Sequence, residues 1–291
     1  MFNRLCIIGT GLIGGSIARA ARAQRLCQEI VAFGREKNLP NLQLAKQLGV
    51  IDQFHTDMAE AMRGVDLVMI ATPVGSMQSI FEAIKPYWSD QAIYTDAGST
   101  KASVVAAVKA VFGFVPTNFV PAHPIAGAER SGVDASDPEL FNNRRLIITP
   151  LDDTDPLAVE KLSLFWQKIG SSVSLMSVEH HDTVLAATSH LPHVLAFALV
   201  GLLGRKDEQR EIFRYAAGGF KDFSRIASSD PTMWTDICLA NKQEIIPLLQ
   251  QLKAELDNIE QVLAADQGQQ LFDTFTYARN ARQRFLDTLD D

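Results

Sequence analysis

Residues 4–16, RLCIIGTGLIGGS, join a short apolar run to a glycine-rich segment that leads into a helical pattern. Gly9, Gly11 and Gly14 match the spacing G-x-G-x-x-G, which joins a first strand to a first helix in dinucleotide-binding folds. There the first glycine permits a tight turn, the second the close approach of a pyrophosphate, and the third close packing of helix on strand. The alternative is a tight strand–helix turn that binds no nucleotide.

The strands that follow favour the nucleotide-binding interpretation. Short apolar runs rich in β-branched residues alternate with helical stretches, and strands are predicted at 4–9, 29–34, 66–73, 91–98, 118–123, 145–150 and 172–176. Such alternation is typical of βαβ units and a largely parallel sheet. The sequence therefore predicts an α/β, Rossmann-like, doubly wound domain over residues 1–177. Its predicted cofactor-binding residues are Gly9, Thr10, Gly11, Leu12, Ile13, Gly14, Arg35 and Thr72.

Beyond residue 177 the strand pattern stops. Helical periodicity predicts helices at 180–203, 207–217, 232–264 and 268–287, which make an all-α domain over residues 178–291. Leucine and alanine dominate these helices, and long apolar stripes of this kind often close against a second copy of the same chain. We therefore expect a homodimer formed through the helical domain.

Composition limits the classes of ligand and location. The chain has 291 residues, of which 47% are hydrophobic and 21% charged, and its formal net charge of −7 gives no long-range attraction for nucleic acid or anionic membrane. The longest apolar run, 194–204, is shorter than the ~20 residues of a membrane helix. The N-terminus runs almost directly into a strand, and three widely spaced cysteines indicate neither a disulfide framework nor a zinc site. We expect a cytoplasmic protein.

The end of the second predicted strand bears on cofactor choice. A site selective for NAD usually places an acid there, about 20 residues after the glycines, to bind the ribose 2′-hydroxyl. This chain reads AFGREK over residues 32–37, so Gly34 and Arg35 stand where the acid is expected. An arginine can pair with a 2′-phosphate, and we predict NADP as the preferred cofactor, with NAD possible through Glu36. The alternative is that Arg35 is only a surface charge.

Polar residues also follow the later strands, at the sheet edge where ligands bind in open α/β folds. The loops are DAGSTK (96–101) and PAHPIAGAERSG (121–132), and their polar residues are Asp96, Ser99, Lys101, His123, Glu129 and Ser131. A histidine among prolines and glycines is a better functional candidate than one on an apolar helix face, so His123 is the leading candidate. Ser99 is either its hydroxyl partner or a helix N-cap.

The helical half holds two further clusters. SHLPHVLAFAL (189–199) places His190 and His193 around Pro192, which should kink the helix. Together with His180 and His181, these histidines could suggest a metal site. No acidic residue accompanies them in a recognised ligand spacing, however, so we predict no metal. The second cluster, 218–234, is either an anion-binding site or a solvated helix face, and its polar and aromatic residues are Lys221, Asp222, Arg225, Asp230 and Trp234.

Taken together, five segments resemble the prephenate/arogenate (cyclohexadienyl) dehydrogenases of tyrosine biosynthesis. They are GTGLIGGS, DAGSTK, HPIAGAERSG, SHLPH and GGFKDFSRIASSDPTMWTDI, they occur in the family's order, and they span residues 8 to 237. The resemblance implies an NAD(P)-binding domain followed by a helical dimerisation domain. It also implies oxidative decarboxylation of prephenate to 4-hydroxyphenylpyruvate, or of arogenate to tyrosine.

The same resemblance implies roles for individual residues. His123 accepts a hydrogen bond from the ring hydroxyl as hydride leaves the ring carbon, and Ser99 orients that pair. A neutral imidazole, with a pKa near ~6.5, suits this role at neutral pH. Arg225 would hold a substrate carboxylate, and Glu129 would lie near the pocket mouth. His193 and Trp234 would line the pocket.

The substrate's second carboxylate needs another cation, and the sequence does not choose among the candidates Lys221, Arg279, Arg282 and Arg284. Many relatives have aspartate at the position of Gly34, which is a departure here. Two other classes remain open. A β-hydroxyacid-type dehydrogenase would place a catalytic lysine in the helical domain and leave His123 unexplained, whereas a non-catalytic dinucleotide sensor would not require His123, Ser99 and Arg225 together.

Overall fold

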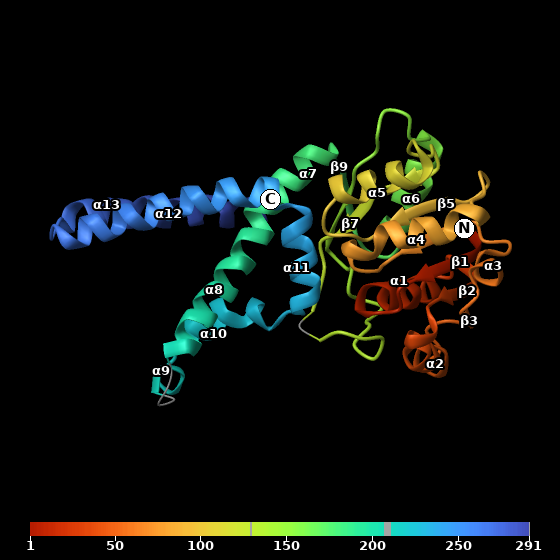
Figure 1. Ribbon diagram of the computed structural model, residues 1–291, viewed down its shortest axis with the longest axis horizontal. Helices are drawn as coiled ribbons and strands as arrows, with labels where there is room; N and C mark the ends of the chain where they lie inside the picture. Colours follow the sequence, from red (N-terminus) through yellow and green to blue (C-terminus); the bar gives the residue numbers. More distant parts are fainter. Residues whose placement is uncertain (129, 207–210, 291) are drawn as a thin grey trace. The chain divides into compact units, whose positions relative to one another are not determined.

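A computed structural model of the chain describes residues 1–128, 130–206 and 211–290. These residues form two compact units, Met1–Lys242 and Gln243–Asp291, and each unit is described by itself. The larger unit contains every strand and the helices up to α11, and the smaller unit is helical (Figure 1).

The larger unit is built on a six-stranded parallel sheet in the order β3-β2-β1-β4-β5-β6. This is the strand order of dinucleotide-binding folds, so the predicted doubly wound domain is confirmed. The strands are β1 (Phe2–Ile8), β2 (Cys27–Phe33), β3 (Gln53–His55), β4 (Leu67–Ile70), β5 (Ile93–Asp96) and β6 (Phe119–Val120). The central strand β1 pairs with two neighbours in register, with Leu5 opposite Ile30 on β2 and Leu67 on β4.

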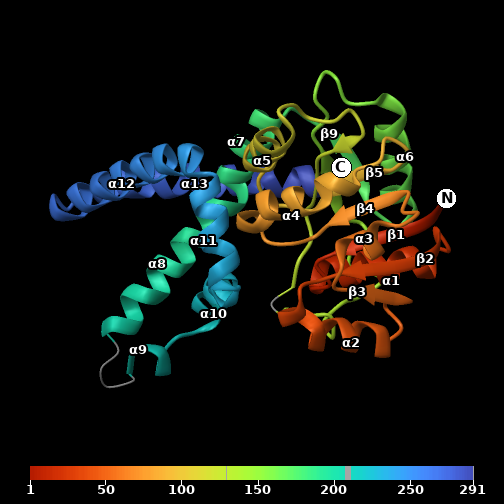
Figure 2. The same ribbon diagram turned by 45° about the vertical axis from the view of Figure 1, so that its right-hand side comes forward.

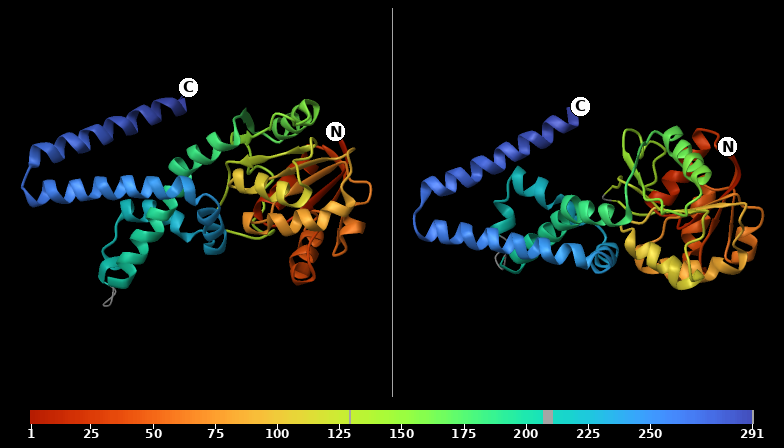
Figure 3. Two further views of the ribbon diagram at one scale, coloured as in Figure 1. Left: turned by 45° about the horizontal axis from the view of Figure 1, so that its top comes forward. Right: turned by 90° about the horizontal axis from the view of Figure 1, so that it is seen from above.

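Helices cover both faces of this sheet because β1 is apolar at every inner position. Leu5 and Ile7 pack into one core cluster with residues of α1 and α6, whereas Cys6 and Ile8 pack into a second cluster with residues of α3, α4 and α5. Figure 3 shows α4 and α5 on one side of the sheet and α6 on the other. The helices are α1 (Leu12–Ala23), α2 (Leu39–Gln47), α3 (Met58–Met62), α4 (Met77–Ile84), α5 (Ala102–Phe112) and α6 (Pro156–Lys168).

A second, three-stranded sheet was not predicted. It contains β7 (Ala122–Pro124), β8 (Arg145–Ile148) and β9 (Ser172–Leu175), with β7 antiparallel and β9 parallel to β8. The single strand predicted at 118–123 is in fact β6 and β7, which lie in different sheets on either side of Pro121. Proline has no backbone N–H to donate to a ladder, so the chain changes sheets there.

The predicted helix at 180–203 contains an irregularity. Helix α7 (Val178–Leu185) passes through a π-helical turn, Ala186–His190, into α8 (Leu191–Lys206). Pro192 was expected to kink this helix, because proline has no N–H to donate to the preceding turn. The structure instead has a wider, π-helical turn just before Pro192. By length and composition alone, Val178–Lys206 is apolar enough to span a membrane.

Shorter helices follow, and α10 packs beside α8 (Figure 1 and Figure 2). Of the predicted helix at 207–217, residues 207–210 lie outside the described residues and only α9 is helical. The predicted helix at 232–264 is two helices that meet at Asn241. The elements are α9 (Glu211–Arg214), α10 (Gly218–Ser224), the 3₁₀ turn Arg225–Ser228 and α11 (Pro231–Ala240).

The smaller unit consists of most of α12 (Lys242–Ala264) and all of α13 (Gly268–Asp290). Figure 3 shows these helices running in opposite directions as a hairpin. Large apolar side chains are exposed along it, namely Leu256, Leu263, Phe272, Phe275, Tyr277 and Phe285.

Candidate active site

The loop after β1 has the geometry that each of its glycines was predicted to provide. Gly9 has a φ of +102°, and a Cβ there would lie 2.6 Å from the carbonyl oxygen of Ala71. A Cβ on Gly14 would lie 2.0 Å from the carbonyl oxygen of Gly9, so side chains are excluded at both positions. Gly11 faces open space, with no heavy atom within 4 Å of its Cβ position. The loop therefore has one open side, at its middle glycine.

The N-terminus of α1 presents its first N–H groups at this open side. Gly11 is the N-cap, no side chain caps the helix, and the first turn, which includes Leu12 and Ile13, contains no acid. Uncapped N–H groups and the helix dipole favour an anion there. The buried Thr72 hydroxyl beside Gly9 has no hydrogen-bond partner among the described residues. These features fit the pyrophosphate of a dinucleotide.

Two of the predicted cofactor residues are placed differently from the glycines. The Thr10 hydroxyl is buried and accepts a hydrogen bond of 2.7 Å from Nδ2 of Asn41, so it holds α2 against the loop. Arg35 is exposed two residues beyond β2. A Cβ on Gly34 would lie 2.9 Å from the end of the Leu42 side chain on α2.

His123 lies on β7 and is 8% exposed. Its Nδ1 atom lies 2.9 Å from Nε2 of His181, a fully buried residue on α7. The Nδ1 atom of His181 in turn lies 2.7 Å from Oδ1 of Asp182. The structure thus connects His123 to a buried carboxylate through one intervening imidazole.

Asp182 also binds the N-terminus of α5. The backbone N–H groups of Lys101 and Ala102 donate to its two carboxylate oxygens at 2.8 and 2.9 Å. Burial by itself would raise the pKa of Asp182, but the hydrogen bonds from His181 and from these two N–H groups lower it below the ordinary value. Asp182 is therefore an ionised hydrogen-bond acceptor at neutral pH.

A fully buried ion pair lies next to this chain. The ammonium group of Lys101 binds the carboxylate of Asp96 and donates to the carbonyl oxygen of Ala122 at 2.6 Å. Burial lowers the pKa of Lys101, while the neighbouring Asp96 carboxylate opposes that shift. Because Ala122 directly precedes His123, the ion pair fixes the backbone that carries the histidine.

The environment of His123 keeps its imidazole neutral. Burial lowers its pKa well below the ordinary value, and His181, Lys101 and His190 lower it further. Among the residues that the structure describes, none hydrogen-bonds the second ring nitrogen, Nε2. His123 therefore offers one ring nitrogen to a ligand.

Aromatic residues of the helical segment pack near this cluster. The rings of His193 and Trp234 stack with centroids 3.7 Å apart, and His193 Nδ1 bonds the Ser189 carbonyl oxygen at 2.9 Å. His190, in the π-helical turn, contacts the same tryptophan edge-to-face. Burial lowers the pKa of His190 to about 4, and the nearby Asp182 carboxylate opposes this shift. Ser99 lies half-buried between β5 and α5.

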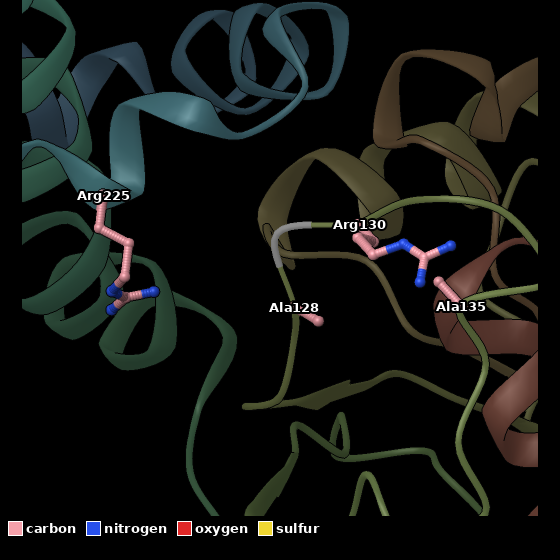
Figure 4. Close-up of a pocket in the computed structure, with 4 residues that line it drawn as sticks. All are labelled: Ala128, Arg130, Ala135 and Arg225. Carbon is pink, nitrogen blue, oxygen red and sulfur yellow. The ribbon is translucent and has the colours of Figure 1, made fainter.

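Of the remaining predicted substrate residues, Arg225 lines an open pocket of about 400 Å³. Figure 4 shows Arg225 on one side of this pocket and Ala128, Arg130 and Ala135 on the other. Burial lowers the pKa of His193, the hydrogen bond to the Ser189 carbonyl opposes that shift, and the nearby Arg225 lowers the pKa further. Lys221 is exposed on α10. Glu129 lies outside the described residues.

His181 and Asp182 were not predicted as site residues. Their signal is weak, because one adjacent histidine–aspartate pair at a helix start is common and their partners lie 58 and 81 residues away. Within residues 1–128, 130–206 and 211–290, no three histidine, cysteine or acidic side chains are grouped as metal ligands would be.

Two family models match the chain. The nucleotide-binding domain of prephenate dehydrogenase matches residues 17–175, and the prephenate dehydrogenase dimerization domain matches residues 177–277. The cyclohexadienyl dehydrogenase of Zymomonas mobilis is 37% identical over 97% of this chain and 96% of that protein. The prephenate dehydrogenase of Bacillus subtilis is 35% identical over 97% of this chain and 76% of that protein.

A solved structure agrees with these matches. The prephenate dehydrogenase of Aquifex aeolicus, in complex with hydroxyphenyl propionate and NAD⁺, superposes with a TM-score of 0.90, is 33% identical, and covers 98% of this chain and 99% of its own. The nearly full-length matches distinguish this chain from a general dinucleotide-binding protein. The chain belongs to the prephenate dehydrogenase family of oxidoreductases.

Proposed function

We propose that the chain catalyses the NAD(P)-dependent oxidative decarboxylation of prephenate, arogenate or both, with His123 accepting the hydrogen bond of the ring hydroxyl. The observation that carries this proposal is the environment of His123: a neutral imidazole with Nδ1 engaged by His181 and Nε2 left for a ligand. A bound nicotinamide dinucleotide would supply the hydride acceptor, and the glycine loop fits its pyrophosphate.

The reaction balances without a net proton. The C–H bond of the carbinol carbon breaks with loss of hydride, the C–CO2 bond breaks and leaves its electron pair in the ring, and the ring becomes aromatic. His123 shares the hydroxyl proton while positive charge develops on that carbon, and the phenol regains it in the product. Holding base and ring in one geometry lowers the barrier, because their relative freedom is lost on binding and not at the reacting step.

Six further residues are proposed to bind or orient the substrate. Arg225 would pair with a carboxylate, and the stacked rings of His193 and Trp234 would form an apolar wall. Ser99, half-buried in the loop between β5 and α5, would orient the hydroxyl and His123. Lys221 is a candidate second cation, and Glu129 a candidate for the pocket mouth.

The preferred cofactor is proposed to be NADP. Support comes from Arg35, exposed two residues beyond β2, and from Gly34, which stands where a site selective for NAD usually has the acid that binds a 2′-hydroxyl. A guanidinium group can bind a 2′-phosphate with two charge-assisted hydrogen bonds.

We also propose a cytoplasmic homodimer with functional domains at 1–177 and 178–291. The exposed apolar side chains of α12 and α13 support a second copy as their partner. We propose that the apolar stretch Val178–Lys206 does not span a membrane. It contains His181 and Asp182, which are buried and hydrogen-bonded and would be costly to place in a lipid core.

The test is NADH or NADPH formation by the purified protein, measured for prephenate and arogenate with each dinucleotide, beside a His123→Asn variant. Turnover that collapses in the variant, while dinucleotide binding by fluorescence is kept, supports the reaction and the role of His123. Folded protein that binds dinucleotide but reduces it with neither substrate overturns the proposal.

A further inference from the structure

The hydrogen bonds behind His123 have only one consistent direction when both imidazoles are neutral. Both oxygens of Asp182 accept backbone N–H groups of α5, so this buried carboxylate carries no proton. The Nδ1 atom of His181, 2.7 Å from Oδ1, must then be the protonated ring nitrogen and the donor. A neutral imidazole has one N–H, so Nε2 of His181 is left as an acceptor.

The same logic passes to the next ring. Nε2 of His181 lies 2.9 Å from Nδ1 of His123, so Nδ1 of His123 must carry the proton and donate. The Nε2 atom of His123 is then unprotonated, and its lone pair can accept a hydrogen bond from a hydroxyl group. The opposite tautomer would present an N–H to the substrate hydroxyl and could not take its proton.

The alternative is a protonated His181 that donates from both nitrogens and reverses the tautomer of His123. The surrounding groups disfavour it. His181 is fully buried, and the buried ammonium of Lys101 faces the same cluster, while burial is the largest cause of a lowered pKa at His181. Asp182 and Asp96 oppose that shift without reversing it, so His181 is neutral at neutral pH.

We propose that His181 and Asp182 are positioning residues that hold His123 in the Nδ1–H tautomer, so that its Nε2 lone pair faces the substrate hydroxyl. This proposal rests on the proposed role of His123 as the acceptor. Partners of this kind around metal-bound histidines, which also fix tautomer and ring orientation, typically change function by about 10- to 100-fold when removed.

The direct test is the tautomer itself, read from ¹⁵N-histidine spectra of the full-length protein with and without dinucleotide. The ring signals are assigned by their loss in His123→Asn and His181→Gln. We expect His123 to show a protonated Nδ1 and an unprotonated Nε2. A protonated Nε2 at neutral pH would overturn the proposal even in an active enzyme.

Kinetics give a second, independent test. His181→Leu removes the acceptor and is expected to lower kcat about 10- to 100-fold with little change in KM. His181→Gln can accept from His123 through Oε1 and donate to Asp182 through Nε2, so it should lose about tenfold less than His181→Leu. The exposed neighbour provides the control, His180→Gln, with unchanged turnover.

The outcomes separate the two proposals. If His123→Asn is inactive but His181→Leu retains full kcat, the positioning role fails and the proposed function stands. If His123→Asn retains full turnover, the proposed role of His123 as the acceptor fails, and the positioning role of His181 and Asp182 fails with it. If His181→Leu does not fold, the spectrum of the unsubstituted protein decides.

Discussion

The carboxylate of Asp96 and the ammonium group of Lys101 form an ion pair in which neither side chain has any solvent exposure. Asp96 ends β5 and Lys101 directly precedes α5, so the pair closes the loop that contains Ser99. Its second contact, from Lys101 to the Ala122 carbonyl at 2.6 Å, connects that loop to the strand bearing His123. The pair is therefore part of the framework of the site.

Removing one partner of this pair should be costly, because it leaves a buried charge without compensation. We expect Asp96→Asn to lower the free energy of unfolding by about 3–5 kcal/mol, measured by urea denaturation at fixed protein concentration. The matched control is Glu60→Gln, which breaks the exposed 2.6 Å pair with Arg63 and should cost about 0–1 kcal/mol. Equal losses in the two variants would show that the buried pair is not structurally important.

The glycine loop gives a prediction that separates steric exclusion from backbone strain. Gly14→Ala places a Cβ 2.0 Å from the carbonyl oxygen of Gly9, so the loop must shift and dinucleotide affinity should fall at least tenfold. Gly64→Ala is the control, because Gly64 has a φ of +67° with no atom within 4 Å. It should lose about 1 kcal/mol of stability and keep its affinity. Isothermal titration with NAD and NADP measures both, and unchanged binding by Gly14→Ala would contradict the assignment.

The sequence predicted those parts of the fold and site that depend on local pattern. The glycine spacing and the apolar β1 follow from residues within a short window, and both the parallel sheet and its helices were predicted correctly. The edge strand β3 (Gln53–His55) was missed because it has only three residues and two of them are polar. The second sheet was missed because Pro121 divides one apolar run between two sheets.

The hydrogen-bond chain behind His123 could not be predicted in this way. Asp182 binds the N-terminus of α5 across 81 residues, and His181 meets His123 across 58. Nothing in the local pattern around either residue indicates such a partner. The prediction for His123 came from the prolines and glycines around it and from the family resemblance, whereas its neutral state follows from burial that the fold creates.

Cofactor selectivity can be tested at Arg35. If its guanidinium binds a 2′-phosphate, Arg35→Ala should raise KM for NADP about tenfold or more, since a charge-assisted hydrogen bond contributes about 1.5–3 kcal/mol. KM for NAD should hardly change. Arg63→Ala, which removes another exposed arginine, is the control and should affect neither. A similar increase in KM for both dinucleotides would mean that Arg35 does not distinguish a 2′-phosphate from a 2′-hydroxyl.

The buried histidines predict how stability depends on pH. Burial lowers the pKa of His123, His181 and His190, the last to about 4, so the folded protein holds all three neutral below the ordinary value of 6.5. The unfolded chain takes up these protons near pH ~6.5, and therefore binds more protons than the fold as the pH decreases. The free energy of unfolding should decrease below about pH 6.5, by about 1.4 kcal/mol per pH unit for each such proton.

Asp182 does not obscure this window. Its folded pKa is lowered below 3.8, so the stability it contributes is present above that value and is lost only as the pH falls through the folded pKa. Urea denaturation at about pH 8, 6 and 5, at one protein concentration, measures the slope. His190→Gln should reduce the slope, because it removes one of the histidines that the fold holds neutral. His180→Gln, at an exposed position on α7, should leave the slope unchanged, and an equal reduction in both variants would contradict the assignment of the slope to burial.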